Sequence, residues 1–255
     1  MSEKVEESIF VGLDETLRRS RMEWSAYASK YDAVCAYNPA YQENIRALVK
    51  RLPDWDLPDD ANILDLGAGT GNFVCAMGKI LPNASYLHVD CNADMNHRAR
   101  QKYSDRKLNV SIVQDYLQRS VLPESSFDLI VCVNVLYAVA PQDLILRRMK
   151  RWLKPDAKLF IIDFGRQVEI IDWGLYLLKH VAEAYGVRHS IKALWENIEF
   201  AKQNRNAQKD FANGIFKQHS TQEFGQLLKS SGFKVNELAT CYRDYCDLAV
   251  CTPER

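Results

Sequence analysis

The sequence predicts an α/β fold built on a doubly wound, mainly parallel β-sheet. Between residues 61 and 165, short apolar runs of strand length alternate with stretches of helix length, a pattern typical of strands joined by helical crossovers. The run FDLIVCVN is apolar almost throughout, which indicates a central strand covered on both faces. Strands are expected at 62–66, 85–90, 109–114, 127–134 and 158–164, and helices near 72–81, 93–103 and 142–153.

A glycine-rich turn, LDLGAGTGNF, follows the first strand. Gly67, Gly69 and Gly71 can adopt backbone angles closed to other residues, and they let the main chain approach a ligand closely. The dinucleotide fingerprint fails in both frames because Asn72 or Val74 occupies its last position, and no Walker-type ending is present. The turn therefore predicts a ligand-binding loop and disfavours a nicotinamide dinucleotide.

Acidic residues end three of the expected strands. Asp65 closes the first run, and Asp90 closes the second, about twenty residues past the glycine turn, where an acid suits two ribose hydroxyls. Asp115 closes the third run, NVSIVQD. Because open α/β sheets bind ligands at the carboxyl ends of their strands, these carboxylates are expected along one ligand-binding edge.

These motifs resemble those of the class I S-adenosylmethionine-dependent methyltransferases, well over residues 61–165 and more loosely from 220 onward. The resemblance implies a Rossmann-like sheet of seven strands and S-adenosyl-L-methionine as the cofactor. It places the glycine loop under the methionine part, Asp90 on the ribose hydroxyls, Asp115 on the adenine amino group and Met95 against adenine. The cofactor-binding residues expected on this basis are Tyr31, Asp65, Gly67, Ala68, Gly69, Gly71, Asp90, Cys91, Met95, Asp115, Tyr116 and Asn134.

Composition narrows the class of partner. The 255 residues include 33 Lys or Arg and 33 Asp or Glu, so no global field would attract nucleic acid. No signal peptide and no apolar run of about 18 residues is present, which favours a cytoplasmic protein that acts without a membrane. The seven scattered cysteines form no C-x2-C pair, so reduced thiols are expected and a metal site is not.

Three regions surround the predicted core, residues 61–165. A helical cap, residues 1–60, carries Trp24, Tyr27 and Tyr31 at helix spacing. Trp24 is expected in the core. The two tyrosines either pack or, as the resemblance implies for the Tyr-Asp pair of small-molecule methyltransferases, close over the cofactor or substrate. Residues 166–219 form an aromatic helical insertion, and residues 220–255 complete the core with a helix and an antiparallel β-hairpin.

The insertion is expected to act as a lid that covers the substrate mouth and excludes water. A structural buttress or a dimer face is the alternative, so a homodimer is compatible with the sequence. The last helix should begin at the capping box Ser220-Thr-Gln-Glu223, in which each of the two end residues bonds the other's backbone.

Methyl transfer is an in-line displacement, which depends above all on orientation of the reacting groups and gains from a base for some acceptors. His219 and His180 are the candidate bases, and Tyr137 could orient an acceptor. Asp163 either faces the cleft or serves as a turn or capping acid. The chain has Asn134-Val-Leu-Tyr137 where the DNA-base methyltransferases usually carry Asp/Asn-Pro-Pro-Tyr, which argues against a DNA base as acceptor.

The predicted function is S-adenosylmethionine-dependent methyl transfer to O, N or C of a small, partly apolar metabolite. A protein or peptide methyltransferase is one alternative, in which the insertion would be a docking surface. A cofactor-binding module without methyl transfer, or a nicotinamide enzyme built on the same sheet, is the other.

Overall fold

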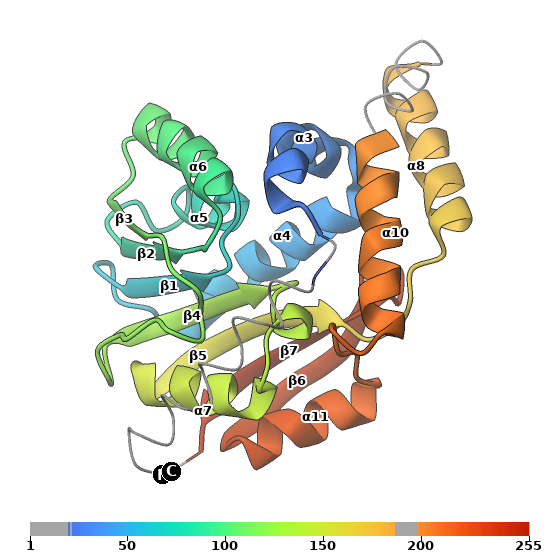
Figure 1. Ribbon diagram of the computed structural model, residues 1–255. Helices are drawn as coiled ribbons and strands as arrows, with labels where there is room; N and C mark the ends of the chain where they lie inside the picture. The colour runs from blue at the N-terminus through green and yellow to red at the C-terminus, as the bar shows by residue number, and fades with distance from the viewer. Residues whose placement is uncertain (1–19, 21, 187–197, 255) are drawn as a thin grey trace.

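The computed structural model describes residues 20, 22–186 and 198–254 of the chain. Seven strands form one sheet in the order β3-β2-β1-β4-β5-β7-β6 (Figure 1). The first five in this order run parallel, and β7 runs antiparallel to both β5 and β6. The strands are β1 (Asn62–Leu66), β2 (Ser85–Val89), β3 (Val110–Val113), β4 (Phe127–Val133), β5 (Leu153–Phe164), β6 (Phe233–Cys241) and β7 (Cys246–Pro253).

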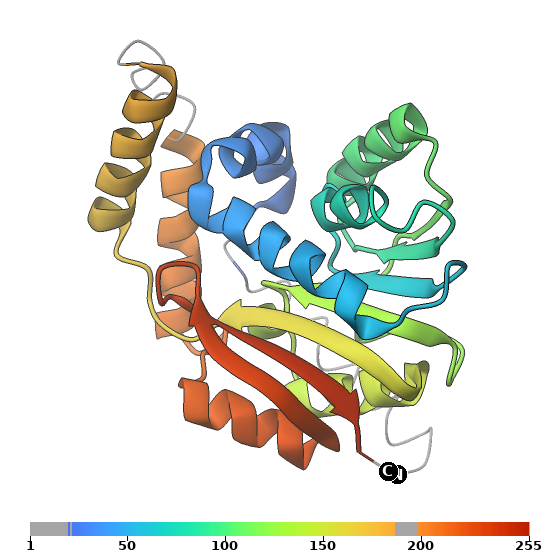
Figure 2. The ribbon, with the colours of Figure 1, turned by 180° about the vertical axis from the view of Figure 1, so that it is seen from behind.

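Helices cover both faces of this sheet. Helices α4, α5 and α6 lie on one face and α7 and α11 on the other, while α8 and α10 stand beyond the carboxyl ends of β4 and β5 (Figures 1 and 2). This confirms the predicted doubly wound, mainly parallel sheet with its C-terminal hairpin. The α-helices are α3 (Trp24–Tyr37), α4 (Pro39–Arg51), α5 (Asn72–Met77), α6 (Ala93–Arg106), α7 (Gln142–Trp152), α8 (Ile170–Tyr185), α10 (Ile198–Ala212) and α11 (Thr221–Ser230), and two short 3₁₀ turns are η1 (Leu52–Trp55) and η2 (Leu136–Ala138).

The central strand β4 behaves as its composition predicts. Leu129 and Val131 pack into the core under α4 and α5, and Ile130 and Cys132 pack into the core over α7 and α11. All four side chains are fully buried. Because neither face of β4 meets water, the strand needs apolar residues at every interior position.

Local signals set several element boundaries where they were expected. At α11, Ser220 Oγ accepts from the Glu223 N–H and Glu223 Oε2 accepts from the Ser220 N–H, so the predicted capping box forms. At α4, Asn38 Oδ1 accepts from the Tyr41 N–H and Pro39 begins the helix, a position where its missing N–H costs nothing.

Other boundaries differ from the prediction. Strand β3 ends at Val113, two residues before Asp115, because this edge strand has only β2 to pair with. Strand β5 begins at Leu153 rather than near 158, since Leu153 already pairs with Phe127 before an irregularity in the register. The first 19 residues of the cap and residues 187–197 of the insertion lie outside the described residues, so the division of the chain into cap, core, lid and completing segment stays a prediction.

Candidate active site

The glycine loop joins β1 to α5 through three left-handed backbone positions. Gly67, Gly69 and Gly71 have φ angles of 63°, 56° and 77°, which glycine adopts without steric cost. A Cβ at Gly67 would collide with Val135, and a Cβ at Gly71 would collide with Tyr103. Apart from its chain neighbours, no atom lies within 4 Å of the place that a Cβ would take at Gly69, so Gly69 faces open space.

Asp90 follows β2 and is held by backbone groups at both carboxylate oxygens. Oδ2 accepts from the Gly69 N–H at 2.8 Å, and Oδ1 accepts from the Asn92 N–H at 2.8 Å. Burial raises the pKa of Asp90, while these two hydrogen bonds act to lower it because they favour the charged form. Each oxygen has a further lone pair for a ligand hydroxyl. The carboxylate is thus fixed between the glycine loop and α6.

Asp65, next to the glycine loop, is a buried acid with an unsatisfied oxygen. Its side chain is 3% exposed, and Oδ2 has no hydrogen-bond partner in the described chain. Burial raises the pKa of this carboxyl, and the nearby Asp90 carboxylate adds to the rise. Asp65 is therefore a buried acid beneath the glycine loop.

A cavity opens at the carboxyl ends of β1, β2 and β4. It brings together eight of the twelve predicted cofactor residues: Tyr31, Gly67, Gly69, Asp90, Cys91, Met95, Tyr116 and Asn134. The remaining four, Asp65, Ala68, Gly71 and Asp115, do not line it. The prediction missed eight other residues of its wall, Trp24, Asn92, Leu117, Gln118, Val133, Val135, Ala138 and Val139. We call this space the cofactor cavity.

The segment after β3 differs from expectation. Asp115 lies past the end of β3, and its Oδ1 accepts from the N–H of Tyr116. Gln118, which is buried, lines the cavity instead. No sequence pattern marks this glutamine, because it lies in an irregular segment between β3 and β4 where neither strand nor helix periodicity applies.

Helix α3 forms one wall of the cofactor cavity. Asp32 Oδ1 accepts from Thr70 Oγ1 at 2.6 Å and from Lys102 Nζ at 2.8 Å, and Ser25 Oγ accepts from Asn92 Nδ2 at 3.0 Å. These bonds tie α3 to the glycine loop and to α6. Trp24 was expected in the core; that prediction is wrong, because its side chain is only partly buried and lines the cavity.

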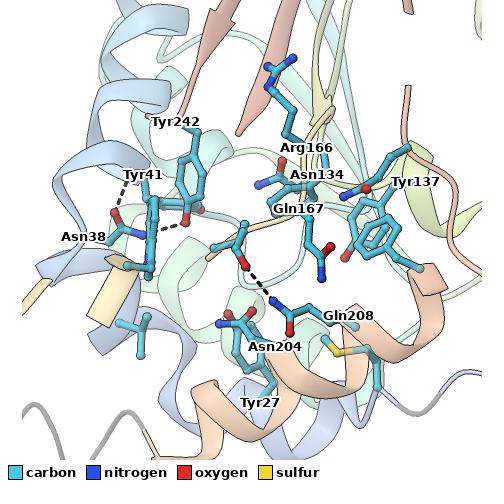
Figure 3. Close-up of a pocket in the computed structure, with 18 of the residues that line it drawn as sticks. Tyr27, Asn38, Tyr41, Asn134, Tyr137, Arg166, Gln167, Asn204, Gln208 and Tyr242 are labelled. Atoms are coloured by element: carbon cyan, nitrogen blue, oxygen red, sulfur yellow. Dashed lines mark hydrogen bonds between the residues drawn. The ribbon is translucent and has the colours of Figure 1, made fainter. Parts of the chain in front are cut away.

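A second cavity lies beside the first, and Trp24, Tyr31 and Asn134 line both. Figure 3 shows it, with side chains from α3, α4, α10, the end of β5 and the β6–β7 turn pointing inward. We call it the acceptor cavity. Its other lining residues are Met22, Tyr27, Val34, Cys35, Asn38, Tyr41, Tyr137, Phe164, Arg166, Gln167, Val168, Trp173, Asn204, Ala207, Gln208, Phe211, Gln218 and Tyr242.

Asn134 occupies the junction of the two cavities in an uncommon conformation. Its φ is 56°, a left-handed value that asparagine tolerates better than most residues. Its N–H donates to the Ile162 carbonyl at 2.7 Å, and its Oδ1 accepts from Cys246 Sγ at 3.6 Å. Strained backbone positions cluster at functional sites, and here the strain turns the chain out of β4 toward both cavities.

The three predicted catalytic residues lie in different places. Tyr137 is buried in the wall of the acceptor cavity, with its ring near those of Phe164 and Phe216. His219 lines neither cavity; its Nε2 bonds with Gln142 Oε1, and burial lowers its pKa. His180 bonds to the Tyr176 carbonyl at 3.0 Å on α8 and also lines neither cavity.

Asp163 does not face the cleft. Its side chain is 2% exposed and lies opposite Asp247 across the β5–β7 pair. Burial raises its pKa. The N–H groups of Val135, Tyr137 and Phe164 lie near enough to oppose that rise, but none reaches hydrogen-bonding geometry, and both carboxyl oxygens have no partner in the described chain. Asp163 is therefore a buried acid beneath the site.

In the described part of the chain, no helix combines the length and apolar character needed to cross a bilayer. The same residues contain no group of three or more His, Cys, Asp or Glu side chains placed to hold a metal ion.

A parallel sheet with a glycine loop, an acid after β2 and a cavity at the strand ends defines a Rossmann-like, nucleotide-cofactor-binding protein. A family model described as "Methyltransferase domain" matches residues 37–238. The chain belongs to this family, the class I S-adenosylmethionine-dependent methyltransferases, whose cofactor is S-adenosyl-L-methionine.

Individual relatives are distant. The ubiquinone/menaquinone biosynthesis C-methyltransferase UbiE of Shewanella sp. (strain ANA-3) is 28% identical over 176 residues, which are 68% of this chain and 66% of that protein. The chain thus matches slightly less than two thirds of this curated relative.

Solved structures share the fold at low identity. A SAM-dependent methyltransferase from Aquifex aeolicus is 18% identical with a TM-score of 0.55, covering 80% of this chain and 88% of its own. The magnesium protoporphyrin IX methyltransferase ChlM from Synechocystis PCC 6803, solved with bound SAH, is 16% identical with a TM-score of 0.57 and covers 84% of each chain.

Proposed function

We propose that the protein transfers a methyl group from S-adenosylmethionine to a small, partly apolar acceptor. The observation that carries this proposal is the pair of adjacent cavities that share Trp24, Tyr31 and Asn134. In-line displacement needs the methyl donor and the acceptor on opposite sides of one short gap, and holding two reactants in this way can supply about 7–11 kcal/mol of the barrier.

The residues present fit the cofactor. Gly69 leaves space for a ligand against the main chain, and Asp90 offers the oxygen lone pairs that two vicinal hydroxyls require. The bound cofactor would supply the electrophilic methyl group; the chain itself orients it, keeps water away and positions the acceptor.

The names of two similar proteins support a small-molecule acceptor. The curated relative is named for ubiquinone/menaquinone biosynthesis and the ChlM structure for magnesium protoporphyrin IX. The acceptor cavity agrees with a partly apolar molecule, since its wall combines aromatic rings with the amides of Gln167, Asn204 and Gln208. Cytoplasmic location, action without nucleic acid or membrane, and a homodimer stay predictions from the sequence.

We also propose that the insertion, residues 166–219, is the lid of the acceptor cavity. Asn204, Gln208 and Phe211 of α10 line that cavity together with Trp173 of α8. The lid is held to the β6–β7 turn, because Arg243 forms an ion pair with Asp172 at 2.8 Å and Tyr242 stacks on Trp173 with ring centroids 4.7 Å apart.

Calorimetric titration tests the cofactor half of this proposal. The purified protein should bind S-adenosylmethionine and S-adenosylhomocysteine, with NADH as the control that does not bind. If neither sulfur compound binds to the folded protein, the proposed function is wrong. If both bind, screening of small metabolites against a methyl-labelled donor tests the acceptor half, and turnover of a peptide alone would contradict it.

A further inference from the structure

The acceptor cavity has an unusual electrostatic character. Among the described residues that line it, Arg166 is the only charged side chain, and no His, Lys, Asp or Glu is present. Arg166 is already occupied, because Nη2 donates to Asp247 Oδ1 at 3.0 Å and to the Cys246 carbonyl at 2.9 Å, while Nη1 donates to Thr221 Oγ1 at 3.1 Å. Its guanidinium therefore belongs to a partly buried network around Asp247 rather than to an acceptor.

The remaining titratable groups of the wall are neutral. Burial raises the pKa of Tyr27, Tyr31, Tyr41, Tyr137 and Tyr242 well above the ordinary phenol value, and burial likewise raises the pKa of the Cys35 thiol. At physiological pH these side chains keep their protons, so none of them serves as a base. A phenol or a carbon acid bound here would have to lose its proton without help from the described wall.

The same wall suits a positive charge. Trp24, Tyr27 and Tyr31 form a run of edge-to-face rings with centroids 6.2 Å and 5.2 Å apart, and both ends of the run, Trp24 and Tyr31, also line the cofactor cavity. A cation over aromatic faces gains about 0.5–2 kcal/mol, more when it is desolvated. The amides of Gln167 and Asn204, which make no hydrogen bond within the described chain, can accept from N–H groups.

We infer that the acceptor is a neutral, partly apolar molecule that is methylated on nitrogen. The nitrogen lone pair forms the new N–C bond as the C–S bond breaks, and sulfur keeps the bonding pair. The positive charge thus leaves the sulfonium and arises on nitrogen. A secondary or primary amine then releases one proton to water. This inference rests on the proposed function and specifies the substrate class of the same site.

The physical reason is charge conservation across the junction. Attack by a neutral nitrogen keeps one positive charge in the site and moves it into the acceptor cavity, where the aromatic rings stabilise it. Attack by an anionic oxygen or carbon cancels the charge instead, and it first requires a base or a free cation to hold the anion. The described wall provides rings for the first case and neither group for the second.

The test compares three flat probes of similar shape, titrated into the protein saturated with S-adenosylhomocysteine at pH 8. N-methylquinolinium is the cation, quinoline the neutral acceptor and 1-naphthoate the anion. N-methylquinolinium should bind at least about tenfold more tightly than 1-naphthoate, a ratio within the range of one or two cation–π contacts. Equal or tighter binding of 1-naphthoate, or no binding of N-methylquinolinium at millimolar concentration, would overturn the inference.

Two variants of one residue check the origin of the preference. Tyr27→Leu removes the ring and should weaken N-methylquinolinium binding about fivefold or more, whereas Tyr27→Phe keeps the ring and should change it less than twofold. S-adenosylhomocysteine affinity reports whether each variant is folded. If the native protein does not bind S-adenosylhomocysteine, the proposed function has failed. If it binds S-adenosylhomocysteine but does not prefer N-methylquinolinium, only this inference is refuted. A product with its new methyl group on oxygen or carbon would refute it too.

Discussion

The Thr70 hydroxyl donates to Asp32 Oδ1 at 2.6 Å and thereby ties the N-terminal helix α3 to the glycine loop. Lys102 Nζ reaches the same oxygen at 2.8 Å and also donates to Asn72 Oδ1 at 2.7 Å. One carboxylate thus links three elements, α3, the loop and α6. Because α3 carries Trp24 and Tyr31 to the junction of the two cavities, this link sets the geometry of both.

Asp32→Ala should therefore weaken S-adenosylmethionine binding although Asp32 does not line the cofactor cavity. Hydrogen bonds to a charged group contribute roughly 1.5–3 kcal/mol when buried, and partial exposure of Asp32 reduces this, so we expect a loss of about tenfold. Calorimetry measures it. Glu43→Ala, which removes an exposed acid paired with Arg46 on α4, is the matched control, and an equal effect of both changes would contradict the link.

Asp90→Ala should weaken cofactor binding more strongly. It removes the only acid that the described wall of the cofactor cavity offers to the ribose hydroxyls, and loss of a charged hydrogen-bonding partner costs about 1.5–3 kcal/mol. Asp90→Asn keeps one acceptor oxygen, so its cofactor affinity should lie between those of the native protein and of Asp90→Ala. Circular dichroism establishes that each variant is folded; unchanged affinity in a folded Asp90→Ala protein would remove this assignment.

Alanine substitutions at Gly67 and Gly69 should affect stability and ligand binding differently. Gly67→Ala must displace Val135 and should lower the free energy of unfolding by about 1–3 kcal/mol from overpacking, in addition to the backbone strain. Gly69→Ala meets no neighbour, so only its positive φ is penalised, by roughly 1–2 kcal/mol. Its methyl group projects into the cofactor space, and it should lose most S-adenosylhomocysteine affinity.

Urea unfolding and calorimetry together give the comparison for these two variants. Gly67→Ala should be the less stable of the two proteins. Gly69→Ala should lose more S-adenosylhomocysteine affinity relative to the stability that it loses. If both variants lose stability and affinity in parallel, the loop acts as one packing unit and Gly69 has no separate role at the ligand.

The lid anchor gives a prediction for the acceptor side. Arg243 pairs with Asp172 and lies over the Tyr176 ring at 4.2 Å, so Arg243→Ala should loosen α8 from the β6–β7 turn. We expect faster amide hydrogen exchange in α8 and a KM for the acceptor raised several-fold, with S-adenosylmethionine affinity unchanged. Arg46→Ala on α4 is the control. Unchanged exchange in α8 would show that the aromatic stack of Tyr242 on Trp173 suffices.

Sequence reasoning recovered the parts of the site that local chain geometry dictates. Gly67, Gly69 and Asp90 were predictable because a strand, a left-handed turn and a helix start leave a signature within about thirty residues. Asn134 and Tyr137 followed from their place at the end of the central strand. The same reasoning gave the parallel sheet, since apolar runs separated by helix-length stretches permit few other folds.

Residues brought in by tertiary packing left no such signature. Gln118 lines the cofactor cavity from an irregular segment. The sequence alone predicts Trp24 in the core, and only the packing of α3 against α6 brings its side chain to the cavity. The sequence left Asp163 open between the cleft and a turn or capping role, because a one-residue change of register moves a side chain to the other face of a strand. Only the pairing of β5 with β7 decides that it lies opposite Asp247.

The buried acid Asp163 gives a prediction for stability against pH. Its pKa is raised by burial, so the folded state binds this proton more tightly than the unfolded state, in which the carboxyl titrates near 3.9. The stabilising contribution is full below about pH 4 and is lost as the pH rises through the folded pKa, because stability falls wherever the folded state holds more protons. Asp163→Asn, which cannot ionise, removes this loss.

Asp163→Asn should therefore equal the native protein in stability near pH 4 and exceed it at pH 8 by about 1–3 kcal/mol, the cost of an unsatisfied buried polar group. Urea midpoints at the two pH values measure the difference. Asp60→Asn, the same change at an exposed acid of the linker before β1, is the matched control. A native protein that gains stability relative to Asp163→Asn as the pH rises would show that the carboxylate is stabilised in place, and the assignment of a raised pKa would fail.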